Sequence, residues 1–250
     1  MIILKSPREI EQMKQPCRIV AEILSRVAEC VIPGVTTKEL DLMAEKLARS
    51  RKATPAFKGY SGYPFSLCCS VNNQVVHGMP SERVLLEGDI ISLDFGVVHS
   101  GFYGDAAVTL PVGSVSDGAR KLMEVTEDSL YRAIKEAVPG KRLSDISFAV
   151  QSYVEDCGFS VVRDFVGHGI GRSLHESPQV PNFGAPGRGI LLKPGMVLAI
   201  EPMINQKGSD VKILEDGWTA VTRDGALSAH FEHTVAICEN GPEILTKLII

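Results

Sequence analysis

The chain has 250 residues, 44% of them hydrophobic, and its 30 acidic and 26 basic residues give a formal net charge of −4. This apolar fraction is ample for a buried core, and the lack of a basic run or stripe argues against a nucleic-acid partner. Apolar runs are too short for a signal peptide or a membrane span, and six scattered cysteines without a CxxC pair indicate reduced thiols. We therefore expect a soluble cytoplasmic protein.

Two helices are expected near the start of the chain. Apolar residues recur every three or four positions over roughly 8–31, which indicates an amphipathic helix that Pro33 and Gly34 end. Thr36, with Glu39 three positions later, has the pattern of a capping box and predicts the start of a second helix.

The same order returns about a hundred residues later. A helical stretch near 116–138 precedes Pro139-Gly140 and a further helix, which we expect Ser144 to cap. VIPGVTTKEL, starting at residue 31, matches AVPGKRLSDI, starting at residue 137. This repetition predicts a single domain over 1–250 with an internal repeat, about 8–115 and 116–245.

Four acids occupy apolar, strand-like settings. They are Asp94, Asp105, Glu201 and Glu232, of which Asp94 and Glu201 fall at matching positions of the repeat. Burial of an unpaired carboxylate costs several kcal/mol, and few basic residues lie nearby in the sequence. A turn, salt-bridged or exposed acid explains any single case, whereas four together favour a metal site. Two divalent cations would balance the charge, and oxygen-rich ligation suggests Mn, Fe, Co or catalytic Zn.

The segment GHGIGRSLHE places His168 and His175 among three glycines. Either histidine alone is more often a hydrogen-bonded core or surface residue than a ligand. Together with VNNQVVHGMP, LDFG followed by YGDAA, EPMI and HFEHT, however, the segment resembles the motif series of the type I methionine aminopeptidases. The resemblance spans about residues 10–245. The short interval from His168 to Glu201 fits type I, because type II enzymes carry an inserted helical subdomain there.

The resemblance implies an α/β (α+β) pita-bread fold, with two pseudo-symmetric halves and helices packed outside a central antiparallel β-sheet. It implies a metalloaminopeptidase that removes the initiator methionine from nascent proteins and prefers a small second residue. A hydroxide activated by two metal ions would attack the scissile carbonyl. The implied partners are the N-termini of nascent polypeptides near the ribosome. The protein would be a cytoplasmic monomer without membrane binding or sequence-specific nucleic-acid binding.

Carried over position by position, the resemblance gives each acid a role. Asp94 would chelate one metal, His168 and Glu201 would hold the other, and Asp105 and Glu232 would bridge. The two ions would be Co, Mn, Fe or Zn. Glu201 would also shuttle the proton.

The remaining assignments concern the substrate. His77 would help to position the substrate amide, and His175 would bond the carbonyl oxygen and stabilise the tetrahedral intermediate. The glycines of the segment GHGIGRSLHE would allow its backbone to approach metal and substrate closely. The methionine pocket would use Tyr60, Tyr63, Cys68 and Trp218, and a monovalent cation (Na or K) would bind at Asn72, Gln74 and Ser228.

Three positions depart from the family pattern. Phe57 stands where many bacterial relatives have cysteine, Leu174 where phenylalanine is usual, and His230 where glutamine is common. The first two would reshape the substrate pocket, and His230 would tune the metal site. None of the three removes a ligand.

Three alternative functions stay open at this point. A proline-specific aminopeptidase shares the implied fold but usually carries a large N-terminal domain that this chain lacks. A pita-bread binding protein without catalysis would not need the intact ligand set. A dinuclear phosphoesterase would need basic phosphate clamps, which the sequence does not offer.

Overall fold

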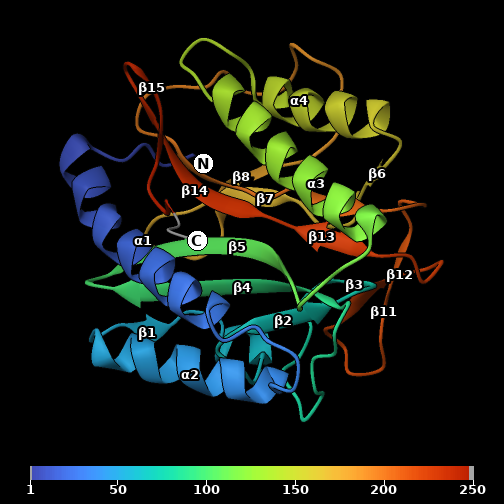
Figure 1. Ribbon diagram of the computed structural model, residues 1–250. Helices are drawn as coiled ribbons and strands as arrows, with labels where there is room; N and C mark the ends of the chain where they lie inside the picture. Colours follow the sequence, from blue (N-terminus) through green and yellow to red (C-terminus); the bar gives the residue numbers. More distant parts are fainter. Residues whose placement is uncertain (1, 248–250) are drawn as a thin grey trace.

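The computed structural model describes residues 2–247 as a large antiparallel sheet with helices packed outside it (Figure 1). The helices of this part of the chain are α1 (Pro7–Ala28), α2 (Thr37–Ser50), α3 (Asp117–Glu136) and α4 (Leu143–Asp156), and a short 3-10 helix spans Tyr60–Gly62. In Figure 1, α1 and α2 lie along one half of the sheet and α3 and α4 along the other half. The α/β architecture expected from the sequence is confirmed.

The large sheet combines strands from both ends of the chain. Its order is β1 (Thr54–Pro55), β4 (Ile90–His99), β5 (Phe102–Pro111), β14 (Glu232–Cys238), β9 (Val197–Ile200), β7 (Gly167–Gly169) and β8 (Glu176–Val180), with β2 (Cys68–Val71) beside β4 and β15 (Gly241–Ile244) beside β14. One small sheet has the strand order β13 (Ser228–His230), β10 (Met203–Asn205) and β6 (Ser160–Val161). A second small sheet has the order β11 (Val211–Ile213), β12 (Ala220–Thr222) and β3 (Gln74–Val76). Within residues 2–247, no helix is both long and apolar enough to cross a membrane.

Helix α2 begins where the sequence predicts, with Thr36 as its N-cap. The Thr36 N–H donates to Glu39 Oε2 at 2.8 Å, and the Glu39 N–H donates to Thr36 Oγ1 at 3.2 Å. This reciprocal pair satisfies two of the donors that a helix N-terminus leaves open, so the capping box is confirmed.

The predicted cap of the fourth helix is wrong. The N-cap of α4 is Arg142, and its N–H donates to the Asp145 carboxylate at 2.7 Å. The Ser144 hydroxyl instead accepts the Arg188 N–H at 2.6 Å and donates to the Arg188 carbonyl at 2.9 Å. A loop 44 positions away therefore occupies the hydroxyl that local sequence assigned to the helix.

Strand register brings three of the predicted acids to one face of the sheet. Asp94 on β4 and Glu232 on β14 both lie opposite Ala107 of the central strand β5. Asp105 is two residues before Ala107, and alternate residues of a strand share a face. The three carboxyl groups therefore project from neighbouring strands in the same direction.

Candidate metal centre and substrate pocket

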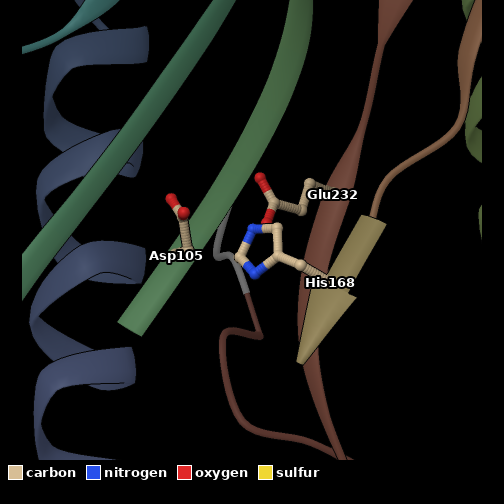
Figure 2. Close-up of side chains that lie close together, drawn as sticks. All are labelled: Asp105, His168 and Glu232. Carbon is tan, nitrogen blue, oxygen red and sulfur yellow. The ribbon is translucent and has the colours of Figure 1, made fainter. Parts of the chain in front are cut away.

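Donor groups from three strands meet at this face of the sheet. Asp105, His168 and Glu232 offer ligand atoms that all lie within 4.8 Å of one another, and all three residues are buried. Figure 2 shows these side chains close together, each projecting from a different strand. Glu201 follows directly after β9, and its Oε1 lies 3.5 Å from His168 Nε2. These four residues and Asp94 all line one cavity.

The acids of this cluster lack cationic partners. Asp94 Oδ1, Asp105 Oδ1 and Glu232 Oε1 are buried and make no hydrogen bond within the described residues. No lysine or arginine of residues 2–247 forms an ion pair with these acids, and Glu201 approaches only the imidazoles of His168 and His230.

Burial of the acids favours their protonated forms. Loss of solvent raises the pKa of Asp94 to about 7 and that of Glu201 to about 8. For Asp105 and Glu232, loss of solvent and then the neighbouring carboxylates raise the pKa well above the usual range. Because orphaned oxygens together with one imidazole suit divalent cations, the donor set fits a divalent metal site.

His168 is prepared to act as a ligand. Burial lowers the pKa of its imidazole to about 4, so the ring is neutral near pH 7. Its Nδ1 lies 2.9 Å from the Gly169 carbonyl oxygen, which can only accept a hydrogen bond. The proton therefore resides on Nδ1, and the Nε2 lone pair is left for a metal ion.

The glycines that flank His168 allow its strand to pack closely between the backbones of two neighbouring strands. A Cβ on Gly167 would lie 2.4 Å from the Ala199 carbonyl oxygen, and a Cβ on Gly169 would lie 2.4 Å from the Ser177 carbonyl oxygen. From the sequence, these glycines were expected to let the backbone come close to the metal and the substrate. In the structure they approach the neighbouring strands, which pack tightly around the His168 backbone.

Two further histidines border the cavity. His175 lies at its exposed rim, where Nδ1 is 2.7 Å from the Tyr60 hydroxyl and the ring centroid is 4.3 Å from that of His168. His77 adopts a left-handed backbone with φ 58° and packs edge-on against Phe165. Loss of solvent, followed by the neighbouring histidines, lowers the pKa of His77 to about 4. Loss of solvent also lowers the pKa of His175.

An aromatic pocket adjoins the acids in a cavity of about 240 Å³. All four residues expected to form the methionine pocket line it, namely Tyr60, Tyr63, Cys68 and Trp218. The Tyr63 and Trp218 rings meet edge to face at 5.2 Å. Phe57 and Leu174, noted as departures, line the same cavity, as do Phe165 and Met203, which sequence reasoning missed. Met203 belongs to the EPMI motif together with Glu201, whereas no local signal marks Phe165.

The remaining predicted residues lie outside the cavity lining. His230 is buried, its Nε2 has no hydrogen-bond partner within the described residues, and that atom lies 3.6 Å from Glu201 Oε2. The Asn72 carbonyl accepts the Ser228 N–H at 2.9 Å, so these two predicted cation ligands adjoin each other. The Gln74 side chain accepts the Val71 N–H at 2.8 Å.

Comparisons with known proteins identify the family of the chain. The metallopeptidase family M24 matches residues 11–239. The chain is 54% identical over 248 residues to methionine aminopeptidase 1 of Bacillus subtilis, covering 99% of this chain and 100% of the relative. It is 57% identical to the methionine aminopeptidase of Clostridium perfringens, with the same coverage.

Solved structures share the fold over the whole chain. The methionine aminopeptidase of Thermotoga maritima matches with a TM-score of 0.97 at 50% identity, covering 99% of this chain and 100% of that chain. The prolidase of Pyrococcus horikoshii matches with a TM-score of 0.82 at 23% identity, covering 100% of this chain and 65% of that chain, and so shares the fold alone. The predicted pita-bread fold is confirmed, and the chain belongs to metallopeptidase family M24, among the bacterial methionine aminopeptidases.

Proposed function

We propose that this protein removes the N-terminal methionine from polypeptides whose second residue is small. The observation that carries the proposal is one cavity in which orphaned carboxylates adjoin an aromatic pocket containing a thiol. Aromatic rings and sulfur pack favourably against a methionine side chain. The names of the relatives from Bacillus subtilis and Clostridium perfringens, both methionine aminopeptidases, support the same substrate.

The acids and His168 are the proposed metal ligands. Asp94 would hold one divalent ion, His168 and Glu201 would hold the other, and Asp105 and Glu232 would contribute to both. When bound, these ions supply Lewis acidity and lower the pKa of a water molecule. Co, Mn, Fe and Zn are all compatible with the oxygen-rich donor set.

Glu201 and the histidines perform the steps that belong to the protein. Glu201 takes a proton from the attacking water and returns it to the leaving nitrogen. His77 positions the substrate amide. His175 Nδ1 lies 2.7 Å from the Tyr60 hydroxyl, and the neutral tautomer in which Nδ1 accepts this hydrogen bond carries its proton on Nε2. That N–H donates to the carbonyl oxygen as it gains negative charge.

Further features of the protein belong to the same proposal. The chain is one domain with an internal repeat, supported by the helix pairs α1–α2 and α3–α4 at matching positions. Asn72, Gln74 and Ser228 hold a monovalent cation, Na or K. The protein acts as a monomer in the cytoplasm, on nascent chains close to the ribosome.

A peptide assay tests the proposed function. Chelated protein is supplied separately with Mn, Fe, Co and Zn and is given Met-Ala-Ser, Met-Ile-Ser or Ala-Pro-Ser. Metal should restore cleavage of Met-Ala-Ser, whereas Met-Ile-Ser should react far more slowly because a large second side chain meets the cavity wall. Cleavage of Ala-Pro-Ser alone, or unchanged turnover by fully chelated protein, would contradict the proposal.

A further inference from the structure

The segment before α1 contains an unusual buried cation. Lys5 is the one buried lysine or arginine among residues 2–247, and its side chain is 4% exposed. Its Nζ pairs with Glu176 Oε2 at 2.5 Å and donates to the Ile3 carbonyl at 3.1 Å. The Glu176 side chain is 7% exposed. This ion pair therefore joins two segments 171 positions apart out of reach of solvent.

Glu176 connects this pair to the substrate site. It follows His175 directly and begins β8. While Oε2 faces Lys5, Oε1 accepts the N–H groups of Arg172 at 2.8 Å and Ser173 at 3.2 Å. The Glu176 carboxylate thus stabilises the loop 171–176 by hydrogen bonds within it and connects this loop to the start of the chain by the ion pair with Lys5.

The surrounding backbone is shaped around the pair. The Lys5 N–H donates to the Gly195 carbonyl at 2.7 Å, which fixes the origin of the side chain. A Cβ on Gly171 would lie 2.4 Å from Lys5 Cε and 2.8 Å from Glu176 Oε1. Any side chain at this position would therefore push the ammonium group away from the carboxylate.

We propose that Lys5 is a positioning residue for peptide hydrolysis, acting through Glu176 on His175. Without the ammonium group, Glu176 would be an uncompensated charge in a nearly dry position and would turn toward water. The loop would then lose the acceptor for two of its N–H groups. The His175 ring would leave its contacts with Tyr60 and His168, and misplacement by about 1 Å can cost on the order of 10² in rate. The inference rests on the proposed role of His175.

A second ion pair on the same loop supplies a matched control. Arg172 pairs with Glu9 on α1 at 3.1 Å, but its side chain is 63% exposed. Exposed pairs of this kind contribute little. Arg172→Ala therefore removes a connection between the same two segments without leaving a buried charge. Lys38→Met, which breaks the exposed Lys38–Glu82 pair, controls for loss of a surface lysine.

The first measurements compare single and double variants of the metal-loaded protein on Met-Ala-Ser, below the unfolding temperature. Lys5→Met should lower kcat by about 10- to 100-fold, with KM and metal affinity changed by less than about threefold. Adding Glu176→Gln should recover most of the loss, because the amide oxygen still accepts both loop N–H groups and no charge remains uncompensated. Both control variants should keep kcat within about threefold.

A second variant covers the case in which Lys5→Met does not fold. Gly171→Ala keeps both charged partners and has a backbone φ outside the left-handed region. Its added methyl group displaces the ammonium head, so it should reproduce the loss of kcat while metal titration stays normal.

The decisive test repeats Lys5→Met in a His175→Ala background. If Lys5 acts through the His175 ring, its loss should lower kcat by less than about twofold once that ring is absent. An equal fold-loss in both backgrounds, a parallel loss of metal affinity, or an Arg172→Ala loss as large as that of Lys5→Met would overturn the proposal. Near-normal kcat in His175→Ala alone would instead disprove the role of His175, so the two failures are distinguishable.

Discussion

Acidic side chains are buried in two regions of this molecule, and they are satisfied in different ways. On α2, Asp41 is 5% exposed, and its Oδ1 accepts the N–H groups of Ser66 at 2.8 Å and Leu67 at 2.9 Å. At the centre of the sheet, Asp105 is 4% exposed, yet its Oδ1 has no hydrogen-bond partner within residues 2–247. Burial raises the pKa of both carboxyl groups.

This difference separates a structural acid from a ligand. A native protein nearly always supplies hydrogen-bond partners to buried polar atoms, so an orphaned oxygen requires an explanation. Asp41 needs none, because the backbone donors offset its loss of solvent. The cluster around Asp105 has neighbouring carboxylates of which three each keep one oxygen without a donor within residues 2–247, and a divalent cation resolves that arrangement.

The largest effect is expected from neutralising one acid of the cluster. Asp105→Asn removes a proposed bridging ligand, and loss of Lewis acid stabilisation worth several kcal/mol should lower kcat/KM by on the order of 10³ or more. The thermal midpoint of the chelated protein should change little, because an amide resembles the protonated carboxyl that burial favours. Peptide kinetics beside calorimetry on the chelated protein test both parts. Activity within tenfold of the unaltered protein would remove Asp105 from the metal site.

Local signals in the sequence were enough for much of the architecture. Thr36 and Glu39 lie within one helical turn, so their capping box could be predicted from spacing alone. The helix expected over 8–31 spans Pro7–Ala28, and that expected near 116–138 spans Asp117–Glu136. Acids in apolar, strand-like settings indicated a metal site, because burial of an unpaired carboxylate is costly.

Contacts between distant segments could not be predicted in this way. The Ser144 hydroxyl does not cap α4, because it bonds the backbone of Arg188, and no sequence spacing connects these two residues. The same holds for Lys5 and Glu176, whose pairing depends on how the start of the chain packs beneath the loop 171–176. Asp41 looked like any acid of a helix, because its donors at Ser66 and Leu67 lie 25 and 26 positions away.

The next largest effect is expected from two histidines of the cavity. His175 lies at the rim, and His168 lies among the acids. His175→Ala removes a proposed donor to the developing oxyanion and should lower kcat by on the order of 10² to 10³, with normal metal binding. His168→Ala removes a proposed ligand and should weaken metal binding as well as activity. Metal titration calorimetry beside steady-state kinetics distinguishes the two variants. Equal losses of metal in both would show that His175 is not the donor proposed here.

Stability against pH offers a third way to separate the cluster from ordinary acids. The pKa of Asp94 is raised to about 7 and that of Glu201 to about 8, whereas both are about 4 in an unfolded chain. Between pH 4 and 8 the folded, metal-free protein therefore holds protons that the unfolded chain has released. The buried His77 and His168 act in the opposite direction up to about pH 6.5, because only the unfolded chain protonates them there. From about pH 6.5 to 8 the acids alone decide the slope, so stability should fall as pH rises, the reverse of the behaviour of a salt-bridged acid.

Bound metal should oppose that trend. Metal binds the deprotonated ligands, so its stabilising effect should grow with pH. Thermal midpoints of chelated and Mn-loaded protein, measured from about pH 6.5 to 8, give both slopes. Asp94→Asn combined with Glu201→Gln should flatten the slope of the chelated protein. A chelated protein that gains stability over this range would contradict the assigned direction of the pKa shifts.

The smallest effect on activity is expected at Asp41, the structural member of the comparison. Asp41→Ala leaves the buried N–H groups of Ser66 and Leu67 without an acceptor, which should reduce the free energy of unfolding by about 1–3 kcal/mol. Asp41→Asn keeps an oxygen in place and should lose less. Because these two residues precede Cys68 in the pocket, Asp41→Ala should raise KM for Met-Ala-Ser by about two- to threefold, equivalent to a few tenths of a kcal/mol. Turnover and metal affinity should stay near normal. If Asp41→Ala instead lost metal, or lowered kcat as far as Asp105→Asn does, burial itself rather than the lack of donors would identify the reactive acids of this fold.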